Sequence, residues 1–523
     1  MKKETNLTDI SFIGSGISTS FTLLYFLEKL KQTKDVESKI SINIIEKHTE
    51  FNVGIPYGSR SGFSTLLITS LKNFLIESEL ELFINWLNKN KIWLLEAFKK
   101  EGGILSKKWL VKNQEAIENN KWEDLYIPRR FFGCYINFRV NNIIDELSKN
   151  GIIQVSFISS EVIDINKNGL FYKIHLKDNS IISSKKVVLS VGSLPITHLC
   201  KNTDVIEKNN FLLVNNTYNP DLLSNLNKIR TFIDNRSNER TNILIVGANA
   251  SALELIYKIN DRPQKEENKT HFTFISTNGK IPGSFIDEEK QKIFLPKHLI
   301  SLKSHNNLTA KEIAEATFKD LDNADEINLN PASTVEIISK SFGELLAHLD
   351  LKELEIFACE YGNLIGKRQR CAGSHYTSVI DDLEKQKRFE HISGRFKDIT
   401  NEHHKLIYKD TLTKEDKVHN TQFHIVINCA GGKTLEDQSI PDLHKNLIDK
   451  KYCVPNKSKI GFHVNQSLEA SENLHIMGPM LAGNIIENKA VWHVEHCGRI
   501  IWLSKIMSEI LFKHFYSKRF VCN

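Results

Sequence analysis

Short runs of apolar residues alternate along the chain with longer segments in which apolar residues recur every three or four positions. Each run has the length and the β-branched content of a buried strand, whereas the longer segments have the spacing of helices. A strand followed directly by a helix occurs near the amino terminus and again at the centre of the chain. This order predicts an α/β fold with parallel sheets. The strand-like runs span 9–13, 41–45, 187–191, 241–246, 271–275 and 423–428.

The first strand ends in a tight turn, Gly14-Ser15-Gly16, which leads straight into a helix through Ile17 and Ser18. Gly14 permits the sharp bend, and Gly16 lets the backbone approach a phosphate group. The next strand stops at Glu46, followed by Lys47. In a β-turn-α-β unit the helix amino terminus holds a pyrophosphate, and the acid at the second strand end binds an adenosine ribose. The sequence therefore predicts a dinucleotide at this turn.

A second unit of the same kind begins at residue 241, but only Gly247 of the glycine fingerprint is present. Asn249 stands at the second glycine position, and Asn is the non-glycine residue that best tolerates left-handed geometry. Ser251 follows in the predicted helix. The following strand ends at Ser276-Thr277-Asn278 without an acid, and Lys280 comes soon after. Small polar residues with a lysine favour NADP slightly over NAD.

Two further strands end in glycine turns. The strand at 187–191 ends at Gly192, and a strand near 474–477 ends at Gly478, with a turn at Gly483-Asn484 and a helix to about residue 515. Backbone amides and a helix amino terminus at such a place would stabilise the negative charge of a reduced flavin. The alternative is an ordinary strand-loop-helix connection.

Composition argues against several classes of protein and of partner. The net charge is +6, but Lys and Glu are interspersed and no basic cluster is interleaved with aromatic residues, so we expect no nucleic-acid partner. None of the eight cysteines forms a CxxC pair or a zinc-type cluster, which argues against a redox dithiol or a metal site and favours a cytoplasmic location. No run of eighteen apolar residues occurs, so we expect no membrane span.

The order of these motifs resembles the bacterial FAD/NAD(P)-binding oxidoreductases with two dinucleotide-binding domains. More distantly it is similar to flavin-containing and N-hydroxylating monooxygenases. The motifs that carry the resemblance are GSGIST from Gly14, GIPYG from Gly54, IPRRFFGCY from Ile127, VVLSVGSLP from Val187, GANASALE from Gly247, RCAGSHY from Arg370, NCAGG from Asn428 and GPMLAGNIIENKAVW from Gly478.

The resemblance implies that FAD lies at Gly14, Gly16 and Glu46, that residues 478–484 follow the flavin, and that NAD(P)H contacts the second turn. It also implies a contact of Arg130 with FAD, a structural ion pair being the alternative. Several relatives carry an arginine where Thr277 stands, so NADPH and NADH both stay open. Together the candidate cofactor residues are Gly14, Ser15, Gly16, Ile17, Ser18, Glu46, Lys47, Arg130, Gly192, Gly247, Asn249, Ser251, Gly478, Gly483 and Asn484.

We expect two Rossmann-like domains, the second inserted into the first. The FAD-binding domain would span 1–200 and 420–523 with a helical insertion at 70–125, and the NAD(P)-binding-like domain would span 201–419 with a helical insertion at 295–360. The expected activity is that of an FAD-dependent enzyme that takes a hydride from NAD(P)H and passes electrons to O₂ or a small molecule, as a hydroxylase does. A flavin oxidase with a degenerate nicotinamide site and a non-catalytic nucleotide sensor are the alternatives. His375 is the one candidate for proton transfer.

Overall fold

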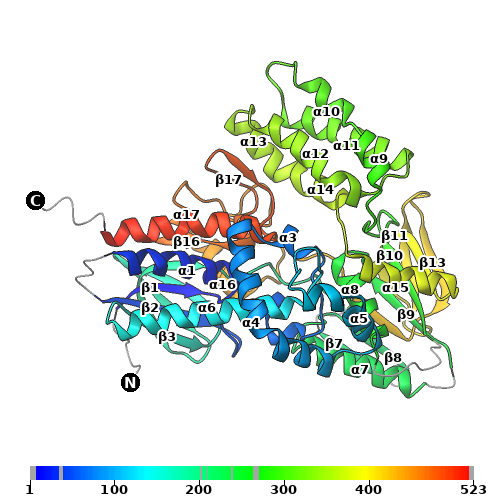
Figure 1. Ribbon diagram of the computed structural model, residues 1–523, viewed down its shortest axis with the longest axis horizontal. Coiled ribbons are helices and arrows are strands. Elements are labelled where there is room, and N and C mark those ends of the chain that lie inside the picture. Colours follow the sequence, from blue (N-terminus) through cyan, green and yellow to red (C-terminus); the bar gives the residue numbers. More distant parts are fainter. Residues whose placement is uncertain are drawn as a thin grey trace, which may run out of the picture.

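The molecule consists of two β-sheets, whose central strands are parallel, and a helical lobe (Figure 1). The computed structural model describes residues 7–33, 39–200, 203–208, 210–236, 239–262 and 270–516. In Figure 1 the sheet that contains β1 lies on the left, the sheet that contains β9 lies on the right, and the helical lobe stands above them. The predicted α/β architecture with helical insertions is therefore confirmed.

The first sheet has eight strands, and its central path runs β15-β16-β6-β1-β2-β3. β1 pairs in parallel with both β2 and β6, and nearly all residues of these strands are buried because helices α1, α6 and α17 pack nearby. The strands are β1 (Thr8–Ile13), β2 (Ile40–Glu46), β3 (Ile153–Ser159), β4 (Val162–Asn168), β5 (Phe171–Leu176), β6 (Ile181–Leu189), β15 (Glu469–Ser471) and β16 (Leu474–Ile476). The three helices are α1 (Ile17–Gln32), α6 (Arg129–Lys149) and α17 (Cys497–Tyr516).

The second sheet also has eight strands, in the order β13-β12-β11-β10-β9-β14-β8-β7. β14 (Ile425–Asn428) lies between β8 and β9, in parallel with both. The expected domain boundary at residue 420 is therefore wrong, because the buried strand that follows it completes the second sheet rather than the first. The other strands are β7 (Val205–Lys208), β8 (Phe211–Val214), β9 (Thr241–Val246), β10 (Thr270–Ser276), β11 (Phe389–Ile399), β12 (Lys405–Asp410) and β13 (Asp416–Gln422), and the helices of this unit are α7 (Leu222–Asp234), α8 (Ala250–Asn260) and α15 (Ser374–Lys385).

The helical lobe leaves the second unit after β10 and returns to it at α15. It has an apolar core of its own, to which Trp492 and the hairpin formed by β17 (Asn484–Ile486) and β18 (Lys489–Val491) contribute. The lobe is thus inserted in the second unit but packs against the carboxyl-terminal part of the first. Its helices are α9 (Glu288–Ile293), α10 (Lys297–Leu302), α11 (Ala310–Glu326), α12 (Pro331–Leu346), α13 (Leu351–Ile356) and α14 (Gly362–Arg368), with a π-helical turn at Phe357–Tyr361.

The other predicted helical insertion forms α3 (Leu71–Phe74), α4 (Glu77–Glu101) and α5 (Ile104–Glu118). Three short elements, α2 (Gly54–Tyr57), η1 (Ser59–Ser61) and η3 (Gly478–Leu481), lie in loops of the first unit, and α16 (Asp442–Asp449) packs on β4. Within the described ranges no helix is long and apolar enough to cross a membrane.

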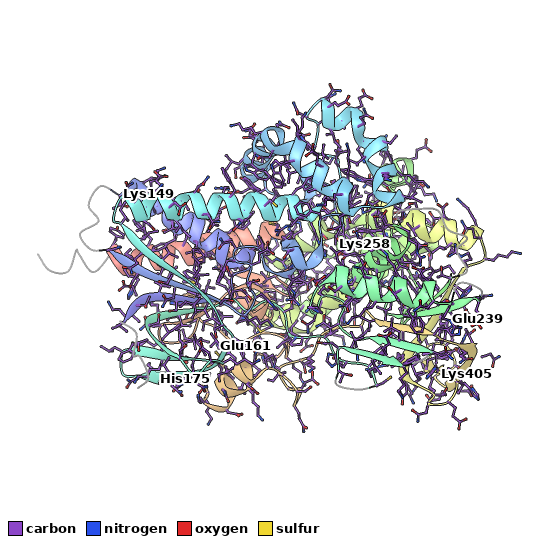
Figure 2. The ribbon with its side chains drawn as sticks, turned by 90° about the horizontal axis from the view of Figure 1, so that it is seen from below. Lys149, Glu161, His175, Glu239, Lys258 and Lys405 are labelled. Carbon is purple, nitrogen blue, oxygen red and sulfur yellow. The ribbon has the colours of Figure 1, made fainter. Side chains whose placement is uncertain are left out.

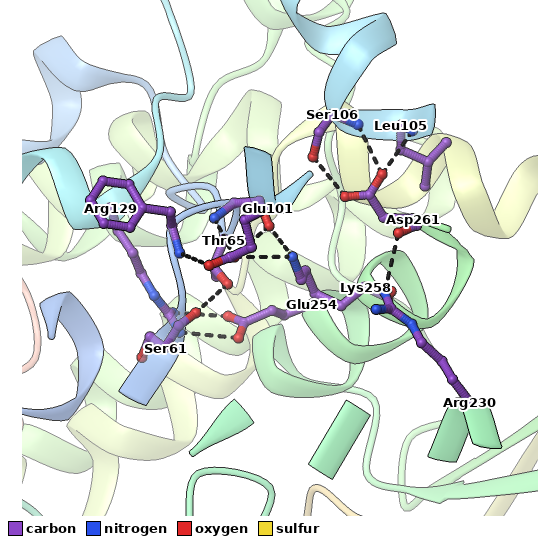
Figure 3. A network of polar contacts seen from close by, with 12 residues as sticks. Ser61, Thr65, Glu101, Leu105, Ser106, Arg129, Arg230, Glu254, Lys258 and Asp261 are labelled. Atoms are coloured by element: carbon purple, nitrogen blue, oxygen red, sulfur yellow. Dashed lines mark hydrogen bonds and ion pairs between the residues drawn. The ribbon is translucent and has the colours of Figure 1, made fainter. Parts of the chain in front are cut away.

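Buried polar contacts join the two units along α8 (Figures 2 and 3). Arg129 of α6 pairs with Glu254 of α8 at 2.8 Å; the Glu254 side chain is buried and that of Arg129 is largely buried. Lys258, which Figure 2 places in the middle of the molecule, lies 3.7 Å from Glu101 of α4. The Asp261 carboxylate accepts hydrogen bonds from the amides of the first turn of α5 at 2.9 and 3.0 Å. Because such groups are costly to bury unless they are paired, these contacts fix α8 against the first unit.

The final helix starts later than the sequence suggests. A β-hairpin occupies residues 484–491, so the turn at Gly483-Asn484 does not lead into α17, which begins at Cys497. His493 and His496 therefore precede the helix. The strand-turn-strand geometry after Asn484 replaces the predicted strand-turn-helix because Gly483 donates its amide to Val491 and closes the hairpin.

Candidate cofactor site

The Gly14-Ser15-Gly16 turn lies at the carboxyl end of β1. Gly14 has a φ of +96°, and a β-carbon there would come within 2.2 Å of the Ser190 carbonyl oxygen, so no other residue fits without moving β6. The Gly14 amide donates to Ile45 of β2. The first glycine is therefore required by the fold itself.

Gly16 is required for another reason. Its φ of −89° is open to any residue, and a β-carbon there would meet only the α-carbon of Gly54, at 4.0 Å. The amides of Gly16, Ile17 and Ser18, at the start of α1, have no hydrogen-bond partner among the described residues. The free space at Gly16 and the unpaired amides beside it fit a pyrophosphate.

Glu46 lies at the end of β2, beside the Gly14-Ser15-Gly16 turn. One oxygen of its carboxylate accepts the Ser15 amide at 2.9 Å, and the other accepts the His48 amide at 3.2 Å. A carboxylate has about four acceptor sites, so one on each oxygen is left for a ribose hydroxyl. Glu46 is half-buried and Lys47 beside it is exposed, which places the pair at the rim.

Gly192 and Gly478 stand at two more strand ends of the same sheet edge. Both have positive φ, and no atom lies within 4 Å of a β-carbon built on Gly192. A β-carbon on Gly478 would lie 3.1 Å from the Ser18 hydroxyl, so the start of η3 meets the start of α1. The structure thus brings Gly14, Gly16, Ser18, Gly192 and Gly478 to the carboxyl edge of β1, β6 and β16, where ligands bind in open α/β sheets.

The structure gives three other candidates structural contacts. Gly483 packs against Asn456, and the Asn484 amide nitrogen donates to the carbonyls of Phe462 and Leu481 while its oxygen accepts the Val464 amide. These contacts favour a hairpin role over the predicted cofactor contact. Arg130 pairs with Glu50 at 2.5 Å and donates to the Tyr57 carbonyl, which is the ion-pair alternative to a cofactor contact.

Sequence reasoning missed the role of the segment that covers the turn. Asn52 has a φ of +70°, donates its amide to the Ser15 hydroxyl at 2.7 Å and accepts the Ser20 hydroxyl at its carbonyl, also at 2.7 Å. Gly54 then approaches Gly16. The Asn-Val-Gly sequence is the signal that could have indicated this tight turn, because Asn and Gly tolerate positive φ.

The turn of the second unit differs from the first in its second position. Gly247 repeats the tight packing, since a β-carbon there would meet the Cys429 carbonyl at 2.3 Å. Asn249, however, caps α8 with its own side chain, which accepts the Ser251 amide at 3.1 Å and donates to the Cys429 carbonyl at 3.0 Å. The space and one of the amides that a pyrophosphate would use are thus occupied by the protein.

Lys280, near the end of β10, is already paired. Lys280 pairs with Asp325 of α11 at 2.7 Å, and the Thr277 carbonyl accepts the Thr411 hydroxyl. The slight preference for NADP that Lys280 suggested therefore loses its physical basis, and the choice between NADPH and NADH stays open.

His375 lies at the start of α15, away from the turn of the first unit. Its ring contacts those of Tyr126 and Tyr257, and Nε2 is buried without a hydrogen-bond partner. Burial and the charge of Lys112 lower the pKa of His375 to about 3. A histidine that stays neutral at physiological pH between aromatic rings fits a packing role better than proton transfer.

Comparisons with known proteins agree with this geometry. Residues 11–194 match a family model described as FAD-NAD(P)-binding. This range contains the whole first turn, Glu46, Lys47, Arg130 and Gly192. The resemblance predicted from the motifs is thereby confirmed, and the predicted cofactors, FAD with NAD(P)H, are those that the family description names. Uncharacterized proteins of Mycobacterium tuberculosis and Mycobacterium bovis are each 28% identical over 513 residues, which cover 96% of this chain and 95% of theirs.

Solved structures share the fold along the whole chain. The ornithine hydroxylase PvdA of Pseudomonas aeruginosa aligns with a TM-score of 0.53 at 13% identity, covering 97% of this chain and 99% of its own. The FAD-bound cadaverine monooxygenase DfoA of Erwinia amylovora aligns with a TM-score of 0.53 at 11% identity over 98% of this chain and 95% of its own. At such identities the likeness establishes the fold alone.

Proposed function

We propose that this protein is an FAD-dependent oxidoreductase that takes a hydride from NAD(P)H and passes electrons to O₂ or a small molecule, in the manner of a hydroxylase. The single observation that carries the proposal is the open turn at Gly16: the fold leaves room and unpaired amides there, and none of the described residues uses them. The family match over residues 11–194 and the shared fold of the two hydroxylases support it.

The chain's own residues bind and orient. The amides of Gly16, Ile17 and Ser18 would hold the pyrophosphate, and Glu46 would hold the ribose. Bound FAD supplies the two-electron chemistry, which the protein tunes through position and electrostatics. Gly192 and Gly478, which present backbone without side chains at the sheet edge, would allow the ring system to lie close to β6 and η3. The helical lobe, packed on the β17–β18 hairpin, would exclude water from that side.

A second candidate rests on Asn249. Because its side chain fills the second turn, a flavin oxidase or dehydrogenase that draws electrons from its own substrate is the alternative. In this case the second unit would serve as scaffold, and NAD(P)H would not reduce the flavin.

Purified protein separates these functions. We expect a yellow protein with about one FAD per chain, bleached under anaerobic conditions by NADPH or NADH. Yellow protein that neither nucleotide bleaches would favour the oxidase. A colourless protein that takes up no added FAD would refute both. In the Gly16→Val variant the branched side chain would occupy the place of the pyrophosphate, so flavin should be lost while the circular dichroism spectrum is retained.

A further inference from the structure

Five exposed lysines gather where α4 ends and α5 begins. They are Lys99, Lys100, Lys107, Lys108 and Lys112. Between residues 97 and 114 the only carboxylate is that of Glu101. It faces inward, because it accepts the amides of Phe63 and Ser64 at 2.7 and 2.8 Å and lies 3.7 Å from the buried Lys258. Within the described ranges none of the five lysines forms an ion pair, so the chain itself leaves this positive charge without a counterpart.

The outer face of α5 combines three of these lysines with apolar side chains. Positions three and four residues apart share one face of a helix, and the residues at this spacing line a common hollow on the surface, namely Ile104, Lys107, Lys108, Val111 and Lys112. Val111 is 74% exposed. The opposite face of α5 is buried through Ser106, Trp109 and Ile117. Lysines that flank exposed apolar side chains are typical of a helix that lies on an anionic surface, because their stems cover apolar groups while the ammonium groups meet the charge.

α4 and α5 form a hairpin on the outside of the molecule. Phe98 packs on Trp109, with ring centres 5.3 Å apart, and Lys91 donates to the Ile117 carbonyl at 3.2 Å, so the two helices run antiparallel. Ile92 of α4 is 74% exposed, as Val111 is. In Figure 2 the hairpin, drawn in light blue, stands out at the top of the molecule. A projecting face does not enclose a small molecule, so its charge fits an extended anionic surface.

We propose that this outer face of the α4–α5 hairpin binds the surface of an anionic phospholipid membrane. The five lysines would supply the attraction, since each lysine near an anionic lipid surface strengthens binding about fivefold. Ile104 and Val111, which lie between the lysines of α5, would enter the boundary between head groups and acyl chains. The inference goes beyond the proposed oxidoreductase function and does not rest on it.

The test uses FAD-loaded full-length protein and two kinds of vesicle, phosphatidylcholine alone and phosphatidylcholine with about one-third phosphatidylserine. Co-sedimentation measures binding. We expect binding only to the vesicles that contain phosphatidylserine, and a loss of binding as added salt screens the charges. The triple variant Lys107→Gln, Lys108→Gln, Lys112→Gln should bind about a hundredfold more weakly, because three of the five charges are gone.

A matched control removes the same charge elsewhere. Lys319, Lys340 and Lys352 are exposed on the helical lobe, and their replacement by Gln should leave vesicle binding unchanged. Both triple variants should melt at the temperature of the wild type, because Lys and Gln have similar helix propensities.

Three outcomes would overturn the proposal: the wild type does not sediment with phosphatidylserine vesicles, its binding is independent of salt, or the α5 triple variant binds as the wild type does. Binding to poly-glutamate but to neither kind of vesicle would also overturn it, and would assign the face to an acidic protein. FAD content is measured in the same samples. Absence of FAD refutes the proposed function, whereas full FAD content without vesicle binding refutes only the membrane surface.

Discussion

The two strand-turn-helix units of this protein start from the same geometry and diverge at one side chain. In both, the first glycine packs on the carbonyl of a neighbouring strand end, Ser190 in one unit and Cys429 in the other. At the second position Gly16 leaves the helix amino terminus open, whereas Asn249 caps it from within. The comparison shows that the first glycine is required by the packing of the turn, whereas the second is required only by the proposed ligand, so a unit can keep its fold without an open turn.

The units also differ in how freely their helices could adjust. The first turn of α1 faces Gly54 and Gly478, whereas α8 is held by ion pairs to α6 at Glu254 and to α4 at Lys258, and by hydrogen bonds from α5 amides to Asp261. A helix so fixed cannot rotate to reshape its turn. Any adjustment of the second unit to a dinucleotide must therefore come from the Asn249 side chain.

The largest expected effect tests the attachment of α8. Glu254→Ala leaves Arg129 buried without its partner, which should cost about 3–5 kcal/mol of the free energy of unfolding, measured by urea denaturation. A loss below about 1 kcal/mol would mean that the two units are not joined through this pair.

The second prediction concerns a substitution that fills the open space at Gly16. Gly16→Asn should place an amide side chain where Asn249 has one and should weaken FAD binding at least a hundredfold, or about 2.7 kcal/mol. Equilibrium dialysis measures the loss, and an unchanged melting temperature of the flavin-free protein shows that the fold is intact. Full flavin retention would contradict the assignment of the site.

The third prediction concerns a buried neutral histidine in each unit. Burial lowers the pKa of His424, beside β14, and of His444, on α16, to about 4. Between about pH 6.5 and pH 4 the unfolded chain binds protons that the folded chain does not, so stability falls as pH falls through this window. Each histidine should contribute up to about 1.4 kcal/mol per pH unit. Calorimetry from pH 7 to pH 5 measures the trend, and His444→Gln should reduce its slope.

The fourth prediction concerns a substitution that removes the side chain filling the turn at Asn249. Asn249→Gly removes a side-chain cap at a cost of a few tenths of a kcal/mol and exposes the Ser251 amide. NADP⁺ or NAD⁺ should then bind about three- to tenfold more tightly, or about 1 kcal/mol, by calorimetric titration. An unchanged or lower affinity would indicate that Asn249 itself contacts the nucleotide.

The smallest effect is expected at the end of β10. Lys280 is exposed and pairs with Asp325, so Lys280→Ala should change stability by less than about 1 kcal/mol. The ratio of NADPH to NADH affinity should stay the same. A selective loss of NADPH binding would restore Lys280 as a contact of the 2′-phosphate.

The sequence determined the strand-turn-helix units, because apolar runs, glycines and the acid at Glu46 act locally and leave a readable pattern. It predicted the two sheets and both helical insertions. The sequence could not assign residues 425–428 to a sheet, because a buried strand has the same apolar pattern in either sheet. Only its pairing with β8 and β9 shows that it belongs to the second.

Tertiary structure decided the rest. Whether Arg130 meets a cofactor or Glu50, and whether Asn249 merely permits a turn or fills it, depend on side chains far apart in sequence. Spacing along a chain records local conformation, whereas charge pairing and open space are properties of surfaces that meet only after folding.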